Sequence, residues 1–231
     1  DIHNGKVKQI VGSSITDETD DVRENYVSEM DAASFAGYYQ QKGVTGGHII
    51  LLNAKSSPYY EATRQQALEA LSAYPGVLQV GGGITPENAM EFIAAGASHG
   101  IVTSYVFKDG TISFENLKRI SDTVGKERLV LDLSCRKKNG FYYIVTDRWQ
   151  KYTSVVLNEE TLDLFAEYYS KYLVHAVDVE GKANGIEEEF AAILGKWNKI
   201  TMNYAGGVRN FSDLQKLTVL GDKKIHVTIG R

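Results

Sequence analysis

The chain has 231 residues, of which 43% are hydrophobic and 23% charged, and its formal net charge is −4. This apolar fraction excludes a disordered chain, and the length can bury a sizeable core. A single cysteine excludes a disulfide framework, and the five scattered histidines form no zinc-binding cluster. No apolar run approaches the ~20 residues of a membrane span, no targeting segment stands at the start, and no basic stripe indicates nucleic acid binding. We therefore expect a soluble, intracellular protein with one domain.

Short apolar runs alternate with longer amphipathic segments along the chain. The apolar runs predict strands at Lys6–Val11, Gly47–Leu52, Val77–Val80, Gly100–Ser104, Leu129–Leu133, Tyr172–Val177, Ile200–Tyr204 and Ile225–Ile229. The amphipathic segments predict helices at Asp31–Lys42, Tyr60–Ala73, Pro86–Ala95, Phe114–Thr123, Glu159–Ser170, Ile186–Trp197 and Phe211–Leu220. The acidic, polar Ser13–Ser28 predicts a long, mobile loop, and residues 141–156 predict a small hairpin inserted after the fifth strand.

Eight strands alternating with seven helices predict parallel strands with right-handed crossovers. An internal repeat supports closure into a barrel, because the glycine pair at Gly82 recurs 124 residues later at Gly206. The strand ends at Ser104 and Gly230 repeat with an offset of 126 residues. We therefore predict an α/β fold, a (β/α)8 barrel of two similar half-barrels. A doubly wound open sheet is the alternative, although it rarely shows such symmetry.

Glycine pairs follow the predicted third and seventh strands. The backbone at such glycines can approach a bound group closely, and the N–H groups there and at the next helix start can cradle a phosphate. Two such glycine pairs at matching positions, called glycine corners below, imply a ligand with a phosphate at each end. The alternative is that each glycine pair only forms a tight turn. The residues involved are Gly82 and Gly83 with Thr103 and Ser104, and Gly206 and Gly207 with Gly230.

A carboxylate pair provides the second candidate constellation. Asp1 begins the first strand region and Asp132 lies near the end of the fifth strand. Strands one and five face each other across an eight-stranded barrel, so both acids can project from the same end. A general acid and a general base on opposite sides of a substrate suit a proton-shuttling isomerisation. The alternative is that each aspartate is a cap or a salt-bridge partner.

Several strings resemble one enzyme family: Asp1-Ile2-His3-Asn4-Gly5, Gly81-Gly82-Gly83-Ile84, Asp132-Leu133-Ser134-Cys135-Arg136, Asp147-Arg148-Trp149-Gln150, His175-Ala176-Val177-Asp178 and Ala205-Gly206-Gly207. The family is phosphoribosylformimino-5-aminoimidazole carboxamide ribotide isomerase, of histidine biosynthesis. The likeness extends over essentially the whole chain and is greatest to its eukaryotic branch, fungal and especially plant. It implies an aldose–ketose isomerisation of a bis-phosphorylated small molecule, without metal or cofactor, by a protein that is commonly a monomer.

The resemblance also implies roles for individual residues. Asp1 matches the general base that moves the proton from C2 of the ribosylamine, and Asp132 matches the general acid that helps to open the ring. Trp149, in the hairpin, is a candidate to stack on the imidazole of the substrate, with core packing as the alternative. The two phosphate sites match Gly82, Gly83, Thr103 and Ser104, and Gly206, Gly207, Gly230 and Arg231. Further candidates for substrate contacts are His48, His175 and Arg136, which could instead be two core histidines and a salt-bridge partner.

The sequence departs from bacterial members of the family at two places. They carry an acid-rich string after strand two and a Thr-Asp pair in strand six, where this chain has Leu52-Asn53-Ala54-Lys55 and His175-Ala176. Both differences fit the eukaryotic branch of the family. Two alternatives to the isomerase are kept: the sister cyclase of the same pathway, which needs ammonia from a glutaminase, and a non-catalytic phosphosugar-binding barrel. A cytoplasmic location is expected, or the plastid stroma if a transit peptide lies upstream.

The length adds one expectation, since a typical barrel of this kind has roughly 250 residues. If Asp1 stands at the end of the first strand, most of that strand and the eighth helix lie outside these 231 residues. The barrel would then be imperfectly closed between strands one and eight, and the second phosphate site would be incomplete.

Overall fold

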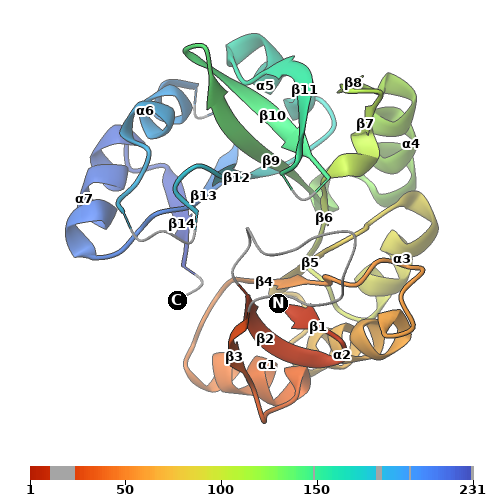
Figure 1. The fold of residues 1–231 in the computed structure, drawn as a ribbon. Helices are drawn as coiled ribbons and strands as arrows, with labels where there is room; N and C mark the ends of the chain where they lie inside the picture. The colour runs from red at the N-terminus through yellow and green to blue at the C-terminus, as the bar shows by residue number, and fades with distance from the viewer. Residues whose placement is uncertain (11–23, 148, 181–183, 198, 230–231) are drawn as a thin grey trace.

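Seven helices surround a curved parallel sheet in the computed structural model, which describes residues 1–10, 24–147, 149–180, 184–197 and 199–229 (Figure 1). Within these ranges each predicted helix is present, and its bounds differ from the expected ones by a few residues. The helices are α1 (Ala32–Gln41), α2 (Tyr60–Ala73), α3 (Pro86–Ala94), α4 (Phe114–Val124), α5 (Glu159–Ala166), α6 (Glu188–Trp197) and α7 (Phe211–Leu220).

The sheet has seven mutually parallel strands in the order β14-β13-β12-β9-β6-β5-β4. A parallel bridge between Ile2 and Leu51 adds β1 (Ile2–His3) beyond β4. Among the described residues no pairing joins β14 to β1, so the barrel is open on this side, as expected. The chain has the predicted α/β barrel fold. The bounds of the seven strands are Gly47–Ile50 for β4, Leu78–Gly81 for β5, His99–Val102 for β6, Leu129–Lys138 for β9, Lys171–Ala176 for β12, Thr201–Ala205 for β13 and Ile225–Thr228 for β14.

The start of the chain differs from the prediction. Lys6–Val11 was expected to be the first barrel strand, but β2 (Lys6–Ile10) pairs antiparallel with β1 and with β3 (Glu24–Val27) in a separate three-stranded sheet. The cause is the two-residue turn Asn4-Gly5, whose φ angles of 52° and 70° reverse the chain directly after β1. The expected loop Ser13–Ser28 therefore ends in a strand, and its residues 13–23 lie outside the described residues.

A buried amide fixes this turn on the barrel. Asn53, which follows β4, accepts a hydrogen bond from the Asn4 N–H at 2.8 Å and donates to the Asn4 side chain at 2.7 Å. Thr63 of α2 donates to Asn53 Oδ1 at 2.6 Å and accepts from the Gly5 N–H at 3.0 Å. Since buried polar groups must be paired, this cluster sets where β1, and Asp1 immediately before it, can lie.

The helices form where an N-cap precedes an apolar face. In α4, the Ser113 side chain accepts a hydrogen bond from the Asn116 N–H, and Leu117, Ile120 and Val124 are buried on one face. The helix ends at Gly125, whose φ of 86° suits glycine. A smaller apolar cluster consists of Ile101, Val130, Leu173 and Ala205, one from each of four adjacent strands.

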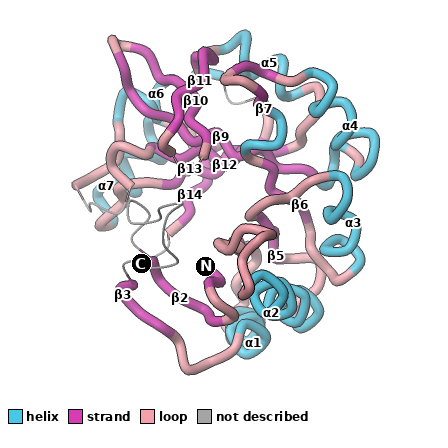
Figure 2. The backbone as a smooth tube through the Cα atoms, turned by 45° about the vertical axis from the view of Figure 1, so that its right-hand side comes forward, coloured by secondary structure: helices cyan, strands magenta, loops and turns pink. Residues whose placement is uncertain are grey.

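The long strand β9 continues beyond the barrel into a hairpin. Its end pairs with β10 (Phe141–Thr146), which pairs in turn with β11 (Lys151–Val156), both antiparallel. A second, shorter hairpin is formed by β7 (Phe107–Lys108) and β8 (Thr111–Ile112). The tube view shows β10 and β11 side by side, extending beyond β9 at the top of the picture (Figure 2). The turn between β10 and β11 carries Trp149 back towards the carboxyl end of the barrel.

Candidate active site

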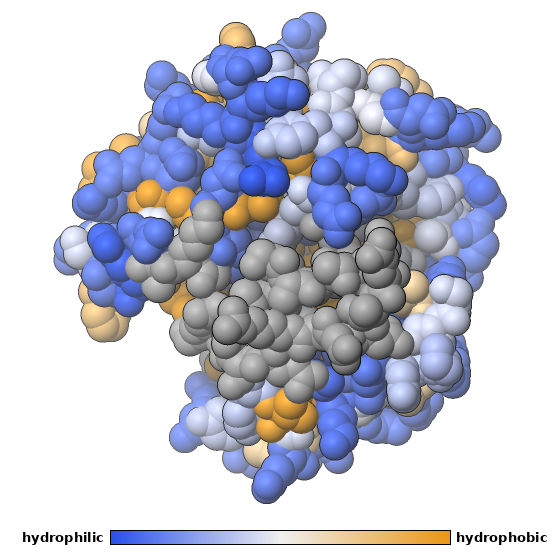
Figure 3. All heavy atoms as spheres, in the orientation of Figure 1, coloured by the Kyte–Doolittle hydropathy of each residue, from blue (hydrophilic) through white to orange (hydrophobic). Residues whose placement is uncertain are grey.

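A cavity of about 1620 Å³ occupies the barrel and its open side. In the view of Figure 3 the described surface is largely hydrophilic, with apolar side chains in small patches. Most of the residues predicted for the site line the cavity: Asp1, His48, Gly82, Gly83, Thr103, Ser104, Asp132, Trp149, His175, Gly206 and Gly207. Gly230 and Arg231 lie outside the described residues.

The first glycine corner lies between β5 and α3. Gly82 and Gly83 have φ angles of 97° and 77°, which favour glycine. A Cβ at Gly82 would lie 2.0 Å from the Leu51 carbonyl oxygen, so no other residue fits there. Asn88 in the first turn of α3 braces the corner, because its side chain accepts from the Thr85 N–H at 2.8 Å and donates to the Gly83 carbonyl at 3.1 Å.

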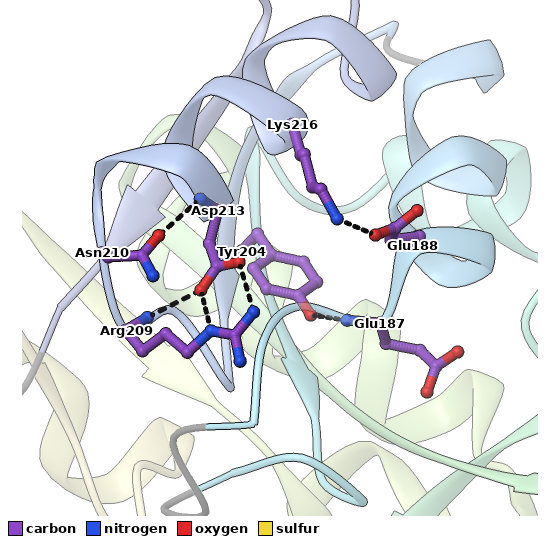
Figure 4. Close-up of polar contacts among 7 residues, drawn as sticks. All are labelled: Glu187, Glu188, Tyr204, Arg209, Asn210, Asp213 and Lys216. Carbon is purple, nitrogen blue, oxygen red and sulfur yellow. Dashed lines mark hydrogen bonds and ion pairs between the residues drawn. The ribbon is translucent and has the colours of Figure 1, made fainter.

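The second corner repeats this arrangement between β13 and α7. Gly206 and Gly207 have φ angles of 125° and 74°, and a Cβ at Gly207 would lie 2.1 Å from the Gly185 carbonyl oxygen. Asp213, 125 residues after Asn88 and also in the first turn of its helix, braces this corner through Arg209 (Figure 4). Its carboxylate accepts from the Arg209 backbone N–H at 3.2 Å and from Nε at 2.9 Å. The half-barrel repeat therefore extends to the side chains that hold the corners.

Asp132 lies on the inner face of β9 with a chain of hydrogen bonds around it. Its Oδ1 atom is 3.0 Å from His175 Nδ1 of β12 and accepts from the Ser134 hydroxyl, also at 3.0 Å. Ser134 Oγ accepts in turn from the Trp149 indole N–H at 3.0 Å. The Trp149 and His175 rings lie 6.1 Å apart between centroids. The side chains of Asp132 and His175 are 13% and 20% exposed, so the pair is largely shielded from water.

The two cavity histidines have opposite electrostatic environments. Burial lowers the pKa of His175, but the charge of Asp132, its hydrogen bond and the charge of Glu180 outweigh burial, so the pKa is raised overall. Burial, and then repulsion from His175, lower the pKa of His48 to about 4, against the attraction of Asp132. At neutral pH His48 is therefore uncharged, whereas the carboxylates around His175 stabilise its imidazolium form relative to a free histidine.

Arg136 lies apart from the other predicted contacts. It is on the outer part of β9, where its Nε pairs with Asp178 at 3.0 Å and its guanidinium lies 5.9 Å from the centroid of the Tyr152 ring. It is not among the described residues that line the cavity. Arg136 is thus a salt-bridge partner in this structure, and its contact with a substrate stays a prediction.

Sequence reasoning missed three groups near the cavity: Ser134, Glu180 and the Arg209–Asp213 pair. Ser134 could have been found from its period-two spacing after Asp132, which places both side chains on one face of a strand. Glu180, whose buried Oε2 atom has no hydrogen-bond partner among the described residues, follows β12 and lines the cavity. No sequence signal marks it apart from other acidic loop residues.

The fold and the cavity define a half-symmetric β/α barrel whose carboxyl-end loops enclose two glycine corners and a buried aspartate–histidine pair, which is an enzyme architecture. The chain belongs to the histidine biosynthesis protein family, whose sequence model matches residues 1–231. It is 51% identical to a chloroplastic protein of Medicago truncatula named 1-(5-phosphoribosyl)-5-((5-phosphoribosylamino)methylideneamino)imidazole-4-carboxamide isomerase, over all of this chain and 73% of the relative.

Fungal relatives carry the same isomerase name. The proteins of Yarrowia lipolytica and Saccharomyces cerevisiae are 40% and 38% identical to this chain, and each alignment covers all of this chain and 88% of the relative. The resemblance expected from the sequence strings is thereby confirmed at the level of the family.

Two features are absent from the described part of the chain, a membrane-spanning helix and a metal-binding cluster. No helix there combines the length and the apolar character that a bilayer crossing requires. Within the same residues, no three side chains of histidine, cysteine, aspartate or glutamate gather as a metal site would need. The expected absence of a metal and of a cofactor stays a prediction.

Proposed function

We propose that this protein is the aldose–ketose isomerase of histidine biosynthesis, acting on the phosphoribosylamino group that its relatives' name specifies. One observation above all supports the proposal: a single cavity is lined by two braced glycine corners and by Asp132 with its hydrogen-bonded neighbours. Two corners suit a substrate with a phosphate at each end. Asp1 and Asp132 suit proton transfer to and from a substrate that is held between the two glycine corners.

The proposed reaction needs two proton transfers on opposite sides of the sugar. Protonation of the ring oxygen on the Asp132 side breaks its bond to C1, and the nitrogen lone pair forms the C1=N double bond. Asp1 then takes the proton from C2, which gives an enaminol that rearranges to the ketone. The glycine corners hold the phosphates, so C1 and C2 stay near these groups.

The test measures conversion of the aminoaldose by the purified chain, coupled to the next enzyme of the pathway. We expect wild-type turnover and at least a ~100-fold loss in Asp132→Asn and Asp1→Asn, with substrate binding within a few-fold by calorimetry. The matched control is Asp122→Asn, because Asp122 lies exposed on α4 in an ion pair with Lys118. Binding without conversion by the wild-type protein would favour the non-catalytic barrel. An ammonia-dependent cyclised product formed from the aminoketose by this chain alone, without the coupling enzyme, would favour the sister cyclase.

The setting of the protein belongs to the same proposal. We infer a monomer that acts on a bis-phosphorylated small molecule, without metal, cofactor or nucleic acid. The name of the Medicago truncatula relative supports the plastid stroma as its location, with the cytoplasm as the alternative. Light scattering of the purified protein tests the monomer, and imaging of the tagged full-length protein tests the location.

A further inference from the structure

Among the described residues, those that form the first glycine corner include no cation. The polar side chains at this corner are uncharged: Thr85, Asn88, Thr103 and Ser104. The nearest charged residue of the helix that follows is an anion, Glu87 in the first turn of α3, and it is paired with Arg119 at 2.5 Å. A phosphate at this corner would meet N–H groups and hydroxyls with a carboxylate close by, so a cation from a neighbouring loop would strengthen its binding.

Three lysines are among the described residues that line the cavity, and they lie at different places. Lys171 is the first residue of β12, so it lies at the amino end of the barrel. Lys8 is on β2, outside the barrel sheet, and its Nζ atom is 3.5 Å from His3 Nδ1. Lys55 follows β4, the strand that pairs with β5, on the carboxyl side. Of these three lysines, Lys55 is therefore the one in the loop next to the first glycine corner.

The backbone around Lys55 is anchored on both sides. Before it, the Leu51 N–H donates to a carbonyl of β5 at 2.9 Å, and the Asn53 side chain is held in the buried amide cluster. After it, the Ser57 N–H donates to the Ala54 carbonyl at 2.9 Å, which closes a turn with Lys55 at its second position. The position of the Lys55 Cα atom beside the corner is thus fixed by the fold, and only the side chain is free to move.

The Lys55 ammonium is not committed to another group of the protein. Its side chain is exposed, and no hydrogen bond or ion pair joins its Nζ atom to any of the described residues. Its charge nevertheless reaches the helix start at the corner. The Thr85 hydroxyl and the backbone N–H of Glu87 lower the pKa of the Glu87 carboxyl most, and the charges of Arg119 and Lys55 lower it further. An available cation therefore lies within electrostatic reach of the first corner.

Resting on the isomerase function, we propose that Lys55 binds the substrate phosphate that the first glycine corner holds. Its ammonium supplies the positive charge that the N–H groups and hydroxyls of the corner lack, and it donates charge-assisted hydrogen bonds to the phosphate oxygens. The phosphate takes no part in the isomerisation, so this contact is the same in the bound aminoaldose and in the transition state. Lys55 therefore acts on substrate binding and not on the proton transfers.

Steady-state kinetics compare Lys55→Gln and Lys55→Arg with a matched Lys108→Gln control. Lys108 is an exposed lysine of β7 that is not among the described residues lining the cavity. We expect Lys55→Gln to raise KM about tenfold, to leave kcat within about threefold and to make KM less dependent on salt. Lys55→Arg keeps the charge and should keep KM within about threefold. The control should keep the wild-type KM, kcat and salt dependence.

A second readout does not need turnover. Inorganic phosphate is titrated into the protein while NMR follows the amide signals of Gly83 and Gly207, one from each corner. In Lys55→Gln, the phosphate affinity at Gly83 should fall about tenfold and that at Gly207 should not change. The inference is wrong if phosphate leaves the Gly83 signal of the wild-type protein unmoved, if its affinity there is equal in Lys55→Gln, or if KM stays within about twofold of the control. If the wild-type protein does not convert the aminoaldose but the affinity at Gly83 still falls, the proposed function fails and the phosphate contact of Lys55 stands.

Discussion

Replacing Gly82 by alanine tests the geometry of the first glycine corner. The φ angle of 97° lies in a region that costs an alanine about 1–2 kcal/mol. The new Cβ would also lie 2.0 Å from the Leu51 carbonyl oxygen, a backbone atom at the junction of β4 with β1. Displacing packed backbone costs about 1–3 kcal/mol more, so we expect Gly82→Ala to lose roughly 2–5 kcal/mol of unfolding free energy.

Gly83→Ala is the matched control, since Gly83 has a similar φ of 77° but nothing within 4 Å of the added Cβ. It should lose only the conformational part, about 1–2 kcal/mol. Urea unfolding followed by circular dichroism measures both variants. Equal losses in the two variants would refute the reasoning, because they would show that the contact with Leu51 costs nothing.

Three further predictions concern charge and hydrogen bonding. The depressed pKa of His48, about 4 against 6.5 unfolded, means that the unfolded chain binds more protons between these values. The free energy of unfolding should therefore fall by about 2 kcal/mol between pH 7 and pH 5 because of His48. Urea unfolding of His48→Asn should show a fall that is smaller by this amount than in the wild type. Asp213→Asn should weaken the ion pair with Arg209, so the Tm of the variant should fall and calorimetry should show weaker substrate binding. An unchanged Tm would show that this ion pair does not stabilise the second glycine corner. Trp149→Phe removes the hydrogen-bond donor to Ser134. It should lower kcat/KM about fivefold, because a net hydrogen bond contributes ~1 kcal/mol. Unchanged kinetics would show that this hydrogen bond does not contribute to catalysis.

Most of the predicted site residues that line the cavity lie near strand ends or in glycine turns, whereas His48 is the second residue of β4 and Trp149 lies in the turn between β10 and β11. Gly82 and Gly206 could be found because their sequence spacing repeats and because glycine is rare enough to mark a turn. Asp132 could be found because it interrupts an apolar strand. Ser134 was passed over, although the same alternation places it beside Asp132 on the inner face of β9.

The first strand was misassigned for a local reason. Lys6–Ile10 has the composition of a strand and is one, but the Asn4-Gly5 turn pairs it antiparallel with β1 outside the barrel. Strand propensity does not specify the partner. The partner is set here by a turn and by the buried amide of Asn53, which lies 49 residues away from Asn4 in the chain.

The sequence by itself determined the alternation of strands and helices, the half-barrel repeat and the family, because each is encoded in local periodicity or in short strings. Only the tertiary structure decided that His175 bonds to Asp132 and that Arg136 pairs with Asp178 instead of lining the cavity. These pairings join residues 43 and 42 positions apart. They depend on the register between neighbouring strands and on burial, which shifts the pKa of a histidine in either direction according to the charges that fold around it.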